Sequence, residues 1–432
     1  MNFKISTLGC KVNIYESEAI AYDLKSKGWK EVEDDPDVQI INTCTVTAMS
    51  DSKSRKLIRQ LIRENPKAIT VVMGCYSQLD SDDASNIDGV NIVIGTNHRK
   101  EIYELIEQYQ LFHQNIVKVE DIKEFKTYEE LSLKDLTYHT RGFIKIQDGC
   151  ENFCTYCAIP YSRGRIKSRS VESTIEEIKI LVDKGVKEVV LAGINTGTYG
   201  KDNKTISLAG LINKIIEEVP NIYRIRLSSI ELKEITDELL DTIVKHQDKV
   251  AHHLHIPLQS GCDTVLKRMN RRYLMKDYME RISYIRSLIP DVTISTDCLA
   301  GFVGETEEEF LETYHNIEKM HLEECHIFPY SKRPHTAAFN FKGHLDPTLI
   351  KERAHKLQSL AKELKLKFYK KYLNQDIDIL FEQEKDGYWM GHSSNYLEVM
   401  VKSNDNLENQ VLNIHLNKIV NGRIEGRVNH GI

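Results

Sequence analysis

The sequence predicts an α/β protein with two parallel sheets, followed by a small antiparallel β-barrel. Strand and helix patterns alternate through residues 1–115 and again through 136–370, and this alternation is typical of parallel sheets. From residue 373 onward the pattern changes to short runs in which apolar and polar residues alternate. With 432 residues, the chain is long enough for two to four domains.

The first part, residues 1–115, reads as a flavodoxin- or Rossmann-like series of βαβ units. Helices are expected at Glu16–Lys27 and Ser52–Glu64. The expected strands are "FKISTLGC", "VQIINTC", "ITVVMGC" and "VNIVIGT".

Three of these strands run into a cysteine, at Cys10, Cys44 and Cys75. The intervals are 34 and 31 residues, about one βαβ repeat, so the three thiols should meet at the carboxyl edge of the sheet. Gly9 and Gly74 precede two of them and permit tight turns there. The alternative is three unrelated buried thiols.

After a polar linker with some helix at about 110–138, a second α/β pattern begins. Amphipathic helices such as Glu172–Lys184 and Leu208–Val219 separate its strands, and Thr306 with Glu309 forms a capping-box signature. The parallel sheet is either open or an incomplete barrel, with functional groups at the strand ends. Its six strands are "GFIKIQ", "KEVVLAG", "YRIRLSS", "AHHLHI", "VTISTD" and "EECHIFPY".

The carboxyl end begins with a basic helix at Pro347–Tyr372. A small barrel of the OB-like kind is expected after it. Its expected strand segments are "DIDILFEQ", "YWMGHSS", "YLEVMVKS" and "VLNIHLNKIVNGRIEGRV".

Composition favours a soluble enzyme, with 41% apolar and 28% charged residues. The start "MNFKISTLGCKVN" is not a secretory signal and no run is long enough to span a bilayer, so we expect a cytoplasmic protein without a membrane partner. In that compartment, nine cysteines favour metal binding or catalysis over disulfides. Net charge is −6, yet basic clusters at 52–63, 162–169, 267–272 and 362–372 favour a polyanionic substrate.

The segment "DGCENFCTYCAIP" holds Cys150, Cys154 and Cys157 with the spacing C-x3-C-x2-C. Structural zinc prefers four ligands, whereas three thiolates leave one iron of a cubane cluster open to a small molecule. Zinc remains an alternative on these residues alone. Tyr156, between the last two cysteines, is expected to pack against an adenine.

These residues carry a resemblance to a known family. The cysteine motif with Tyr156 resembles that of radical S-adenosylmethionine (SAM) enzymes, and nearly the whole chain is similar to the methylthiotransferases of that superfamily. "TLGCKVN" looks most like the members that act on N6-threonylcarbamoyladenosine beside the tRNA anticodon. The other matching segments are "INTCTVT", "MGCYSQ", "IQDGCENFCTYCAIPYSRGRIKSR", "SSIE", "HLHIPLQSGCDTVLKRMNRRY", "TDCLAGFVGETEEEF" and "FPYSKR".

The resemblance implies a radical-SAM partial (β/α)6 barrel in the centre and two 4Fe–4S clusters. Cys150, Cys154 and Cys157 would hold the one that binds SAM, and Cys10, Cys44 and Cys75 an auxiliary one that carries sulfur. One SAM would methylate that sulfur and a second would give the radical that removes hydrogen from carbon 2 of the adenine. An electron donor of the flavodoxin or ferredoxin type and a sulfur source are implied as partners.

Strand-end positions and the resemblance also indicate which residues contact SAM. The alternative for each of them is a structural role in packing or capping. Arg163 and Arg169 are alternatives for holding a substrate phosphate or the SAM carboxylate. The nominated contacts are Tyr156, Gly193, Asn195, Ser229, Glu231, Gln259 and Asp297.

The tail, 373–432, resembles a TRAM domain, an RNA-binding module, but it is net acidic. The basic helix before it and the clusters at 52–63 and 267–272 are therefore expected to hold more of the tRNA. Tyr388, Trp389 and Tyr396 either stack bases or fill the barrel core.

Two positions depart from the family pattern: Val303 replaces a usual proline and His335 a usual glycine, so local loop shape is open there. Cys262, Cys298 and Cys325 match no cluster motif and are interpreted as ordinary buried thiols. The rival functions are the same chemistry on N6-isopentenyladenosine in tRNA or on a ribosomal-protein aspartate, and a non-catalytic zinc- and RNA-binding protein.

Overall fold

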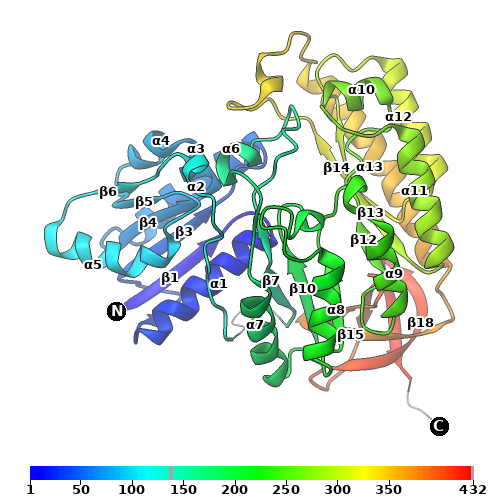
Figure 1. The fold of residues 1–432 in the computed structure, drawn as a ribbon, viewed down its shortest axis with the longest axis horizontal. Helices are drawn as coiled ribbons and strands as arrows, with labels where there is room; N and C mark the ends of the chain where they lie inside the picture. Colours follow the sequence, from blue (N-terminus) through cyan, green and yellow to red (C-terminus); the bar gives the residue numbers. More distant parts are fainter. Residues whose placement is uncertain (136–139, 430–432) are drawn as a thin grey trace.

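The computed structural model describes residues 1–135 and 140–429. Figure 1 shows an amino-terminal α/β part, a central parallel sheet wrapped by helices, and a small barrel beneath it at the carboxyl end. The predicted class and the order of the three parts are confirmed. Residues 136–139 and 430–432, at the ends of two predicted domain ranges, lie outside the described residues.

The amino-terminal sheet has six parallel strands in the order β2-β1-β3-β4-β5-β6. The central strand β3 is buried throughout, as expected for a parallel sheet covered on both faces. Two edge strands were not predicted, since β2 and β6 have only two and three residues and carry little pattern. The strands are β1 (Asn2–Thr7), β2 (Lys30–Glu31), β3 (Val38–Thr43), β4 (Ile69–Gly74), β5 (Ile92–Ile94) and β6 (Ile116–Lys118).

Helices cover both faces of this sheet. One apolar layer joins the sheet to α1 and α5, and the other joins it to α2 and α4. α1 begins directly after Cys10, five residues earlier than the sequence pattern predicts, because only the short turn of residues 8–10 separates it from β1. The helices are α1 (Lys11–Ser26), α2 (Ala48–Glu64), α3 (Cys75–Leu79), α4 (Ser81–Ser85) and α5 (Ile102–Phe112).

The central part is an arc of six parallel strands, with β7, β10 and β11 in one sheet and β12, β13 and β14 in the next. A bridge between Ile225 and Val250 links the two sheets, so the arc is an incomplete barrel. The strands are β7 (Gly142–Lys145), β10 (Glu188–Ala192), β11 (Arg224–Leu227), β12 (His253–His255), β13 (Thr293–Ala300) and β14 (Glu324–Pro329). Two short strands, β8 (Gln147–Asp148) and β9 (Lys167–Ser168), follow β7.

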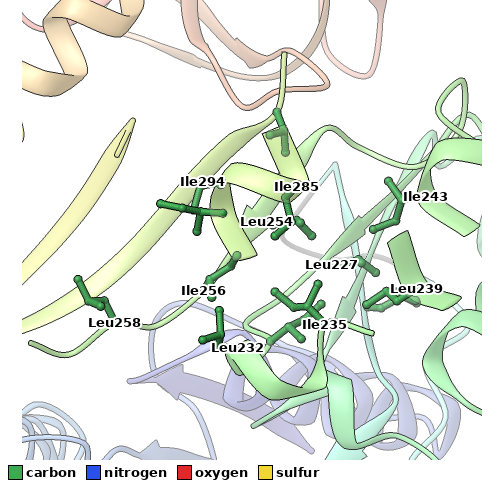
Figure 2. Close-up of a cluster of buried hydrophobic side chains, with 14 of the residues drawn as sticks. Leu227, Leu232, Ile235, Leu239, Ile243, Leu254, Ile256, Leu258, Ile285 and Ile294 are labelled. Atoms are coloured by element: carbon green, nitrogen blue, oxygen red, sulfur yellow. The ribbon is translucent and has the colours of Figure 1, made fainter. Parts of the chain in front are cut away.

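One face of the arc packs on its helices, and Figure 2 shows side chains such as Leu254, Ile256 and Ile294 in that apolar layer. The Thr306–Glu309 capping box predicted from the sequence begins α12. The helices are α6 (Ile159–Arg163), α7 (Val171–Asp183), α8 (Leu208–Glu218), α9 (Asp237–Lys245), α10 (Asp263–Arg268), α11 (Met275–Leu288) and α12 (Glu307–Met320).

The opposite, inner face of the arc is polar and carries Glu188, Arg226, His253 and His255, which alternate with the core residues. Helix α1 lies against part of this face: Tyr15 and Ala19 pack with Phe143 of β7 and Val190 of β10. The amino-terminal part therefore contributes to the barrel interior.

Helix α13 (Pro347–Lys370) leads to a closed five-stranded barrel of order β15-β16-β17-β19-β18. Trp389 lies in its core, whereas Tyr396 stacks on the rings of His253 and His392. The strands are β15 (Asp376–Lys385), β16 (Tyr388–His392), β17 (Glu398–Val401), β18 (Val411–Val420) and β19 (Arg423–Val428).

Loop 393–396 of this barrel closes the amino-terminal end of the central arc. The guanidinium of Arg226 donates hydrogen bonds to the carbonyls of Ser393 and Ser394, each at 3.0 Å. The hydroxyl of Thr293 donates to the carbonyl of Asn395 at 2.5 Å. Across the described residues, none of the helices has the length and apolarity that a membrane crossing would need.

Candidate functional site

The structure brings Cys10, Cys44 and Cys75 to one edge of the amino-terminal sheet, where the neighbouring strands β1, β3 and β4 end. Gly9 has φ +114°, and a Cβ there would lie 3.2 Å from the Cys44 sulfur. Gly74 has φ +108°, and a Cβ there would lie 2.6 Å from the Thr43 carbonyl. Only glycine fits these two turns, so the close packing of the three cysteines is encoded by their neighbours.

Burial raises the pKa of Cys75 to about 11, and the nearby Cys44 and Cys10 add to the effect. The charge of Arg163 opposes it, and its Nε donates to the Cys75 sulfur at 3.2 Å. Burial also raises the pKa of Cys44. Burial therefore favours the protonated thiols of Cys44 and Cys75, and a metal that binds them must displace those protons.

The second triplet, Cys150, Cys154 and Cys157, lies in the loop between β8 and α6. Backbone hydrogen bonds fold this loop, from Cys150 N to Gly164 O and from Cys157 N to Cys154 O, both at 3.0 Å. Burial raises the pKa of Cys150 to about 11 and also raises the pKa of Cys157. Arg271 Nη1 lies 3.4 Å from the Cys154 sulfur and is thus the counterpart of Arg163 at the first triplet.

The spacing of the three sulfur atoms in each triplet bears on which metal group could bind there. Among the described residues, His255, Asp297 and His326 form the only group whose three ligand atoms lie within 4.8 Å of one another, so both cysteine triplets are wider. A tetrahedral zinc ion about 2.3 Å from each sulfur would hold them about 3.8 Å apart. A cubane binds each thiolate through a different iron and needs a wider spacing. Neither triplet is drawn in to the spacing that a single zinc ion would impose.

Gly193 and Asn195 follow β10 beside the second triplet's loop. Gln147 Oε1 accepts hydrogen bonds from the backbone N–H groups of Ile194 and Asn195, at 2.9 and 3.0 Å. The Asn195 side-chain nitrogen is buried without a hydrogen-bond partner, as is the Ser228 hydroxyl, which the sequence analysis missed. Unpaired buried donors of this kind are suited to a bound ligand.

Ser229 and Glu231 follow β11. The Ser229 carbonyl accepts hydrogen bonds from Thr196, and the Glu231 carboxylate is paired with Arg271. A pocket at this position is lined by Cys154, Glu231 and Arg271, among other residues. Glu231 is thus at the second triplet but already has a cation as its partner.

Gln259, Asp297 and Tyr156 occupy the far side of the arc. Gln259 has φ +71° and pairs in parallel with Cys298, and the Asp297 carboxylate lies 3.3 Å from His255 Nε2. Tyr156 is directed edge-on at Phe302, with ring centroids 6.4 Å apart. The ring is therefore fixed beside Cys154 and Cys157.

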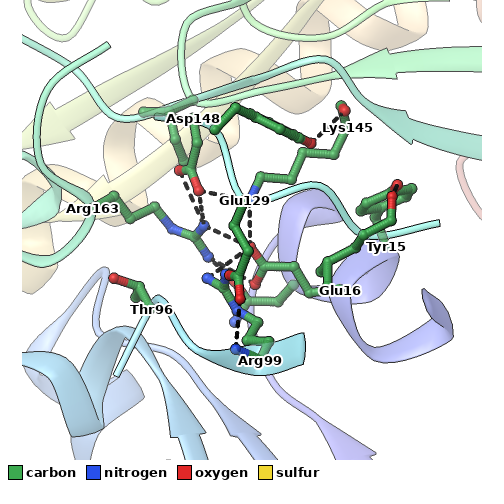
Figure 3. A network of polar contacts seen from close by, with 12 residues as sticks. Tyr15, Glu16, Thr96, Arg99, Glu129, Lys145, Asp148 and Arg163 are labelled. Atoms are coloured by element: carbon green, nitrogen blue, oxygen red, sulfur yellow. Dashed lines mark hydrogen bonds and ion pairs between the residues drawn. The ribbon is translucent and has the colours of Figure 1, made fainter. Parts of the chain in front are cut away.

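The expectation that Arg163 and Arg169 hold phosphate or the SAM carboxylate is wrong, because both side chains are buried and satisfied within the protein. Figure 3 shows Arg163 between Glu16 of α1 and Asp148 of β8, with Lys145 and Arg99 beside it. Arg169 is bound by Glu177, Glu130 and the Tyr15 hydroxyl.

The same burial corrects two of the basic clusters. In 162–169 only Arg165 is exposed among the basic residues, and in 267–272 Arg268 and Arg271 are engaged by Glu309 and Glu231. The basic residues of α2 and most of those of α13 remain on the surface. Arg165, Lys267 and Arg272 are exposed as well, so each of the four predicted clusters keeps some accessible basic residues, and α2 and α13 keep the most.

Lys11 is a further site residue that the sequence analysis did not single out. It is half-buried at the start of α1, and its charge interacts with Arg141, Arg226 and Glu188 of the inner barrel face. Burial, with Arg141 and Arg226 next in size, lowers the pKa of Lys11 to about 8. Its surroundings could not be predicted from the sequence because the barrel residues around it come from distant strands.

Comparison with known proteins identifies related families and sequences. Residues 144–317 match the model of the radical SAM superfamily, and residues 2–95 match "Uncharacterized protein family UPF0004". The chain is 41% identical to the threonylcarbamoyladenosine tRNA methylthiotransferase MtaB of Bacillus subtilis, over 95% of this chain and 93% of that protein. It is 37% identical to the tRNA-2-methylthio-N(6)-dimethylallyladenosine synthase of Thermoanaerobacter pseudethanolicus, over 88% and 82%.

Among solved structures, the fold resembles the radical SAM methyltransferase TsrM from Kitasatospora setae, with a TM-score of 0.56 and 14% identity over 76% of this chain and 74% of that one. It also resembles the cobalamin-dependent SAM radical enzyme OxsB, with a TM-score of 0.52 and 12% identity over 85% and 56%. These likenesses concern the fold alone.

Proposed function

This chain belongs to the radical SAM tRNA methylthiotransferases, and we propose that it acts on carbon 2 of N6-threonylcarbamoyladenosine next to the anticodon. The observation that carries the proposal is the pair of three-cysteine sites, each one ligand short of a filled cubane. One open cluster would suffice to cleave SAM. A second one is needed if sulfur is transferred as well.

In the proposal, Cys150, Cys154 and Cys157 hold the cluster that binds SAM, and Cys10, Cys44 and Cys75 hold the auxiliary cluster. When bound, the two clusters and two SAM molecules supply a radical that removes hydrogen from carbon 2 and a methylated sulfur that replaces it. The zinc alternative receives no support from the width of the triplets.

The protein's own groups provide charge and orientation around these sites. Arg163 and Arg271 each place a guanidinium against one cysteine sulfur, which offsets the negative charge of the thiolates that a cluster requires. Asn195 and Ser228 offer unpaired donors to the SAM that would lie over the arc. Gly193, Ser229, Glu231, Gln259, Asp297 and Tyr156 remain proposed SAM contacts.

The choice of nucleoside is supported by relatives that carry the threonylcarbamoyladenosine name, at 36–41% identity in the proteins from Bacillus subtilis, Aquifex aeolicus and Chlamydia pneumoniae. The relative that acts on dimethylallyladenosine reaches 37%, so identity alone separates the two targets weakly. The isopentenyl nucleoside therefore stays the main alternative, ahead of a ribosomal-protein aspartate.

The proposal also covers the tRNA-binding surface, the partner proteins and the domain ranges. We expect the tRNA to lie along the exposed basic faces of α2 and α13 and against the exposed Lys267 and Arg272 of the 267–272 cluster. A flavodoxin- or ferredoxin-type reductant and a sulfur source would act with the enzyme in the cytoplasm. The domain ranges 1–115, 136–370 and 373–432 are likewise proposed units.

The test is an iron and sulfide count on protein purified and reconstituted without oxygen. About eight irons should fall to about four in a Cys150/Cys154/Cys157→Ala variant and also in a Cys10/Cys44/Cys75→Ala variant. Four irons that fall to none in the first variant would remove the auxiliary cluster from the proposal, and zinc without sulfide would refute it. Mass spectrometry of tRNA nucleosides from a deletion strain then identifies the nucleoside that loses its methylthio group.

A further inference from the structure

The inference rests on the proposed function and concerns how the threonylcarbamoyl group is recognised. In adenine, carbon 2 and carbon 6 are the two carbons bonded to N1, so a substituent on N6 lies on the same edge of the base as carbon 2. A protein group that reads this substituent must therefore lie close to the sulfur donor. The threonyl end carries a carboxylate and a hydroxyl, whereas a dimethylallyl group is a hydrocarbon.

Lys11 meets the positional requirement because it directly follows Cys10, a proposed ligand of the sulfur-carrying cluster. Cys10 is exposed and Lys11 keeps part of its surface accessible, so this end of α1 is open to a ligand. The Lys11 side chain extends toward the polar inner face of the arc, where its charge interacts with Arg226 and Glu188. The ammonium thus lies between the first cysteine triplet and the barrel interior.

The Lys11 ammonium has no hydrogen bond or ion pair with any residue that the structure describes. The carboxylates nearby are already occupied by arginines. Glu188 accepts from Arg226 at 2.8 Å and lies 3.2 Å from Arg224, and Glu382 lies 3.0 Å from Arg141. A lysine enclosed among satisfied ion pairs keeps all three donors available for an anionic group.

The wall beyond Lys11 is polar and carries three histidines, His253, His255 and His326. Burial, together with Arg226 and Lys11, lowers the pKa of His253, so this ring is neutral; its Nδ1 is buried without a partner, and His255 follows it on the same face of β12. His326 on β14 is exposed, with its ring 5.9 Å from that of His255. The Asp297 carboxylate beside these rings is paired with His255. Such a surface favours a polar, anionic substituent over a hydrocarbon.

We propose that Lys11 is a specificity-determining residue that binds the carboxylate of the threonyl group and so selects threonylcarbamoyladenosine.

The test measures binding of 17-nucleotide anticodon stem-loops to the reconstituted enzyme by fluorescence anisotropy without oxygen. Two stem-loops differ only in the threonyl group, which is a free acid in one and a methyl ester in the other. The wild type should bind the acid about 10- to 100-fold more tightly, the range of a hydrogen-bonded charge. Lys11→Met, which keeps the chain length, should bind both stem-loops with the affinity of the ester.

Two control variants separate this role from general effects. Lys30→Met removes a positive charge from β2, which pairs with the opposite end of β1 from Cys10, and should keep the full preference for the acid. Lys11→Arg should restore part of the preference, because it restores the charge. Iron content of each variant shows whether the auxiliary cluster is intact.

The inference is overturned if the wild type does not distinguish acid from ester, if Lys11→Met keeps the full preference, or if it weakens both stem-loops equally. Nucleoside analysis separates this from a failure of the proposed function. An enzyme that methylthiolates threonylcarbamoyladenosine but does not need Lys11 refutes only the inference. A wild type that leaves this nucleoside unmodified refutes the function as well.

Discussion

Replacing Arg163 with methionine should destabilise the contact between the amino-terminal and central parts more than any exposed arginine does. Arg163 belongs to α6 of the central part, and its guanidinium donates to Glu16 and Asn13 of α1 and to the Cys75 sulfur. It also binds Asp148 through both carboxylate oxygens at 3.1 Å. One buried side chain therefore joins the two parts at the first cysteine triplet.

The size of the effect follows from counting the charges in this network. Ion pairs link three cations, Arg163, Arg99 and Lys145, to three carboxylates, Glu16, Asp148 and Glu129, so the buried network is neutral. Without Arg163 the ion-paired set holds three carboxylates and two cations, and the buried Lys167 nearby offsets part of the excess charge on Asp148. Removing one partner of a buried ion pair costs about 3–5 kcal/mol. For a cooperative unit of about 150–250 residues this lowers the melting temperature by about 6–20 °C.

Calorimetry of the reconstituted protein measures this change. The matched control is Arg55→Met on α2, because Arg55 is partly exposed and forms a single ion pair with Asp83 at 3.5 Å. That pair contributes about 0–1 kcal/mol, so the control should melt within a few degrees of the wild type. Equal shifts in the two variants, or a shift below about 2 °C for Arg163→Met, would refute the idea that this network holds the two parts together.

Three further predictions follow from single positions. Burial alone would raise the pKa of Glu16, but the cations Arg163, Arg99 and Lys145 lower it from its usual 4.5 to about 2. The Glu16 carboxylate therefore stabilises the fold by about 3 kcal/mol above pH 4.5, and this stabilisation is lost as the pH falls toward 2. Glu16→Gln should flatten the pH dependence of urea unfolding in that range, and an unchanged slope would contradict this. Gly74→Ala should displace Cys75 and lower the iron count by about four. The control Gly387→Ala, also at positive φ but in open space, should keep all the iron. Full iron content in Gly74→Ala would show that the turn is not needed. His335→Gly should change the free energy of unfolding by less than about 1 kcal/mol, because relief of the left-handed backbone at φ +64° offsets the lost Asp80 contact, and a loss above 2 kcal/mol would contradict that balance.

Much of the fold follows from local patterns in the sequence. Strands that end in Cys10, Cys44 and Cys75 indicate one sheet edge, because parallel strands share the direction of their carboxyl ends. The helix signal of Thr306 and Glu309 is equally local and marks the start of α12. The usual glycine at position 335 has a structural reason as well, since His335 adopts a left-handed backbone.

Which charged residues are buried and which are exposed could not be predicted from local sequence patterns. "SRGRIKSR" looks like a solvated basic segment, yet Arg163 and Arg169 are buried because their carboxylate partners, Glu16 and Glu177, come from other elements. Sequence spacing carries no information about such distant pairs. Lys11 shows the opposite case, in which a lysine near the start of the chain is brought to the inner face of a barrel formed 130 residues and more later.

The contact between loop 393–396 and the central arc affects how truncations of this enzyme should be interpreted. Deleting the carboxyl-terminal barrel would remove the carbonyl acceptors of the buried Arg226 and Thr293 and the ring that stacks on His253. Loss of activity in such a truncation would therefore report damage to the catalytic scaffold together with any loss of RNA affinity. Substitutions confined to the solvent-facing strands of the barrel separate the two, because they leave this loop in place.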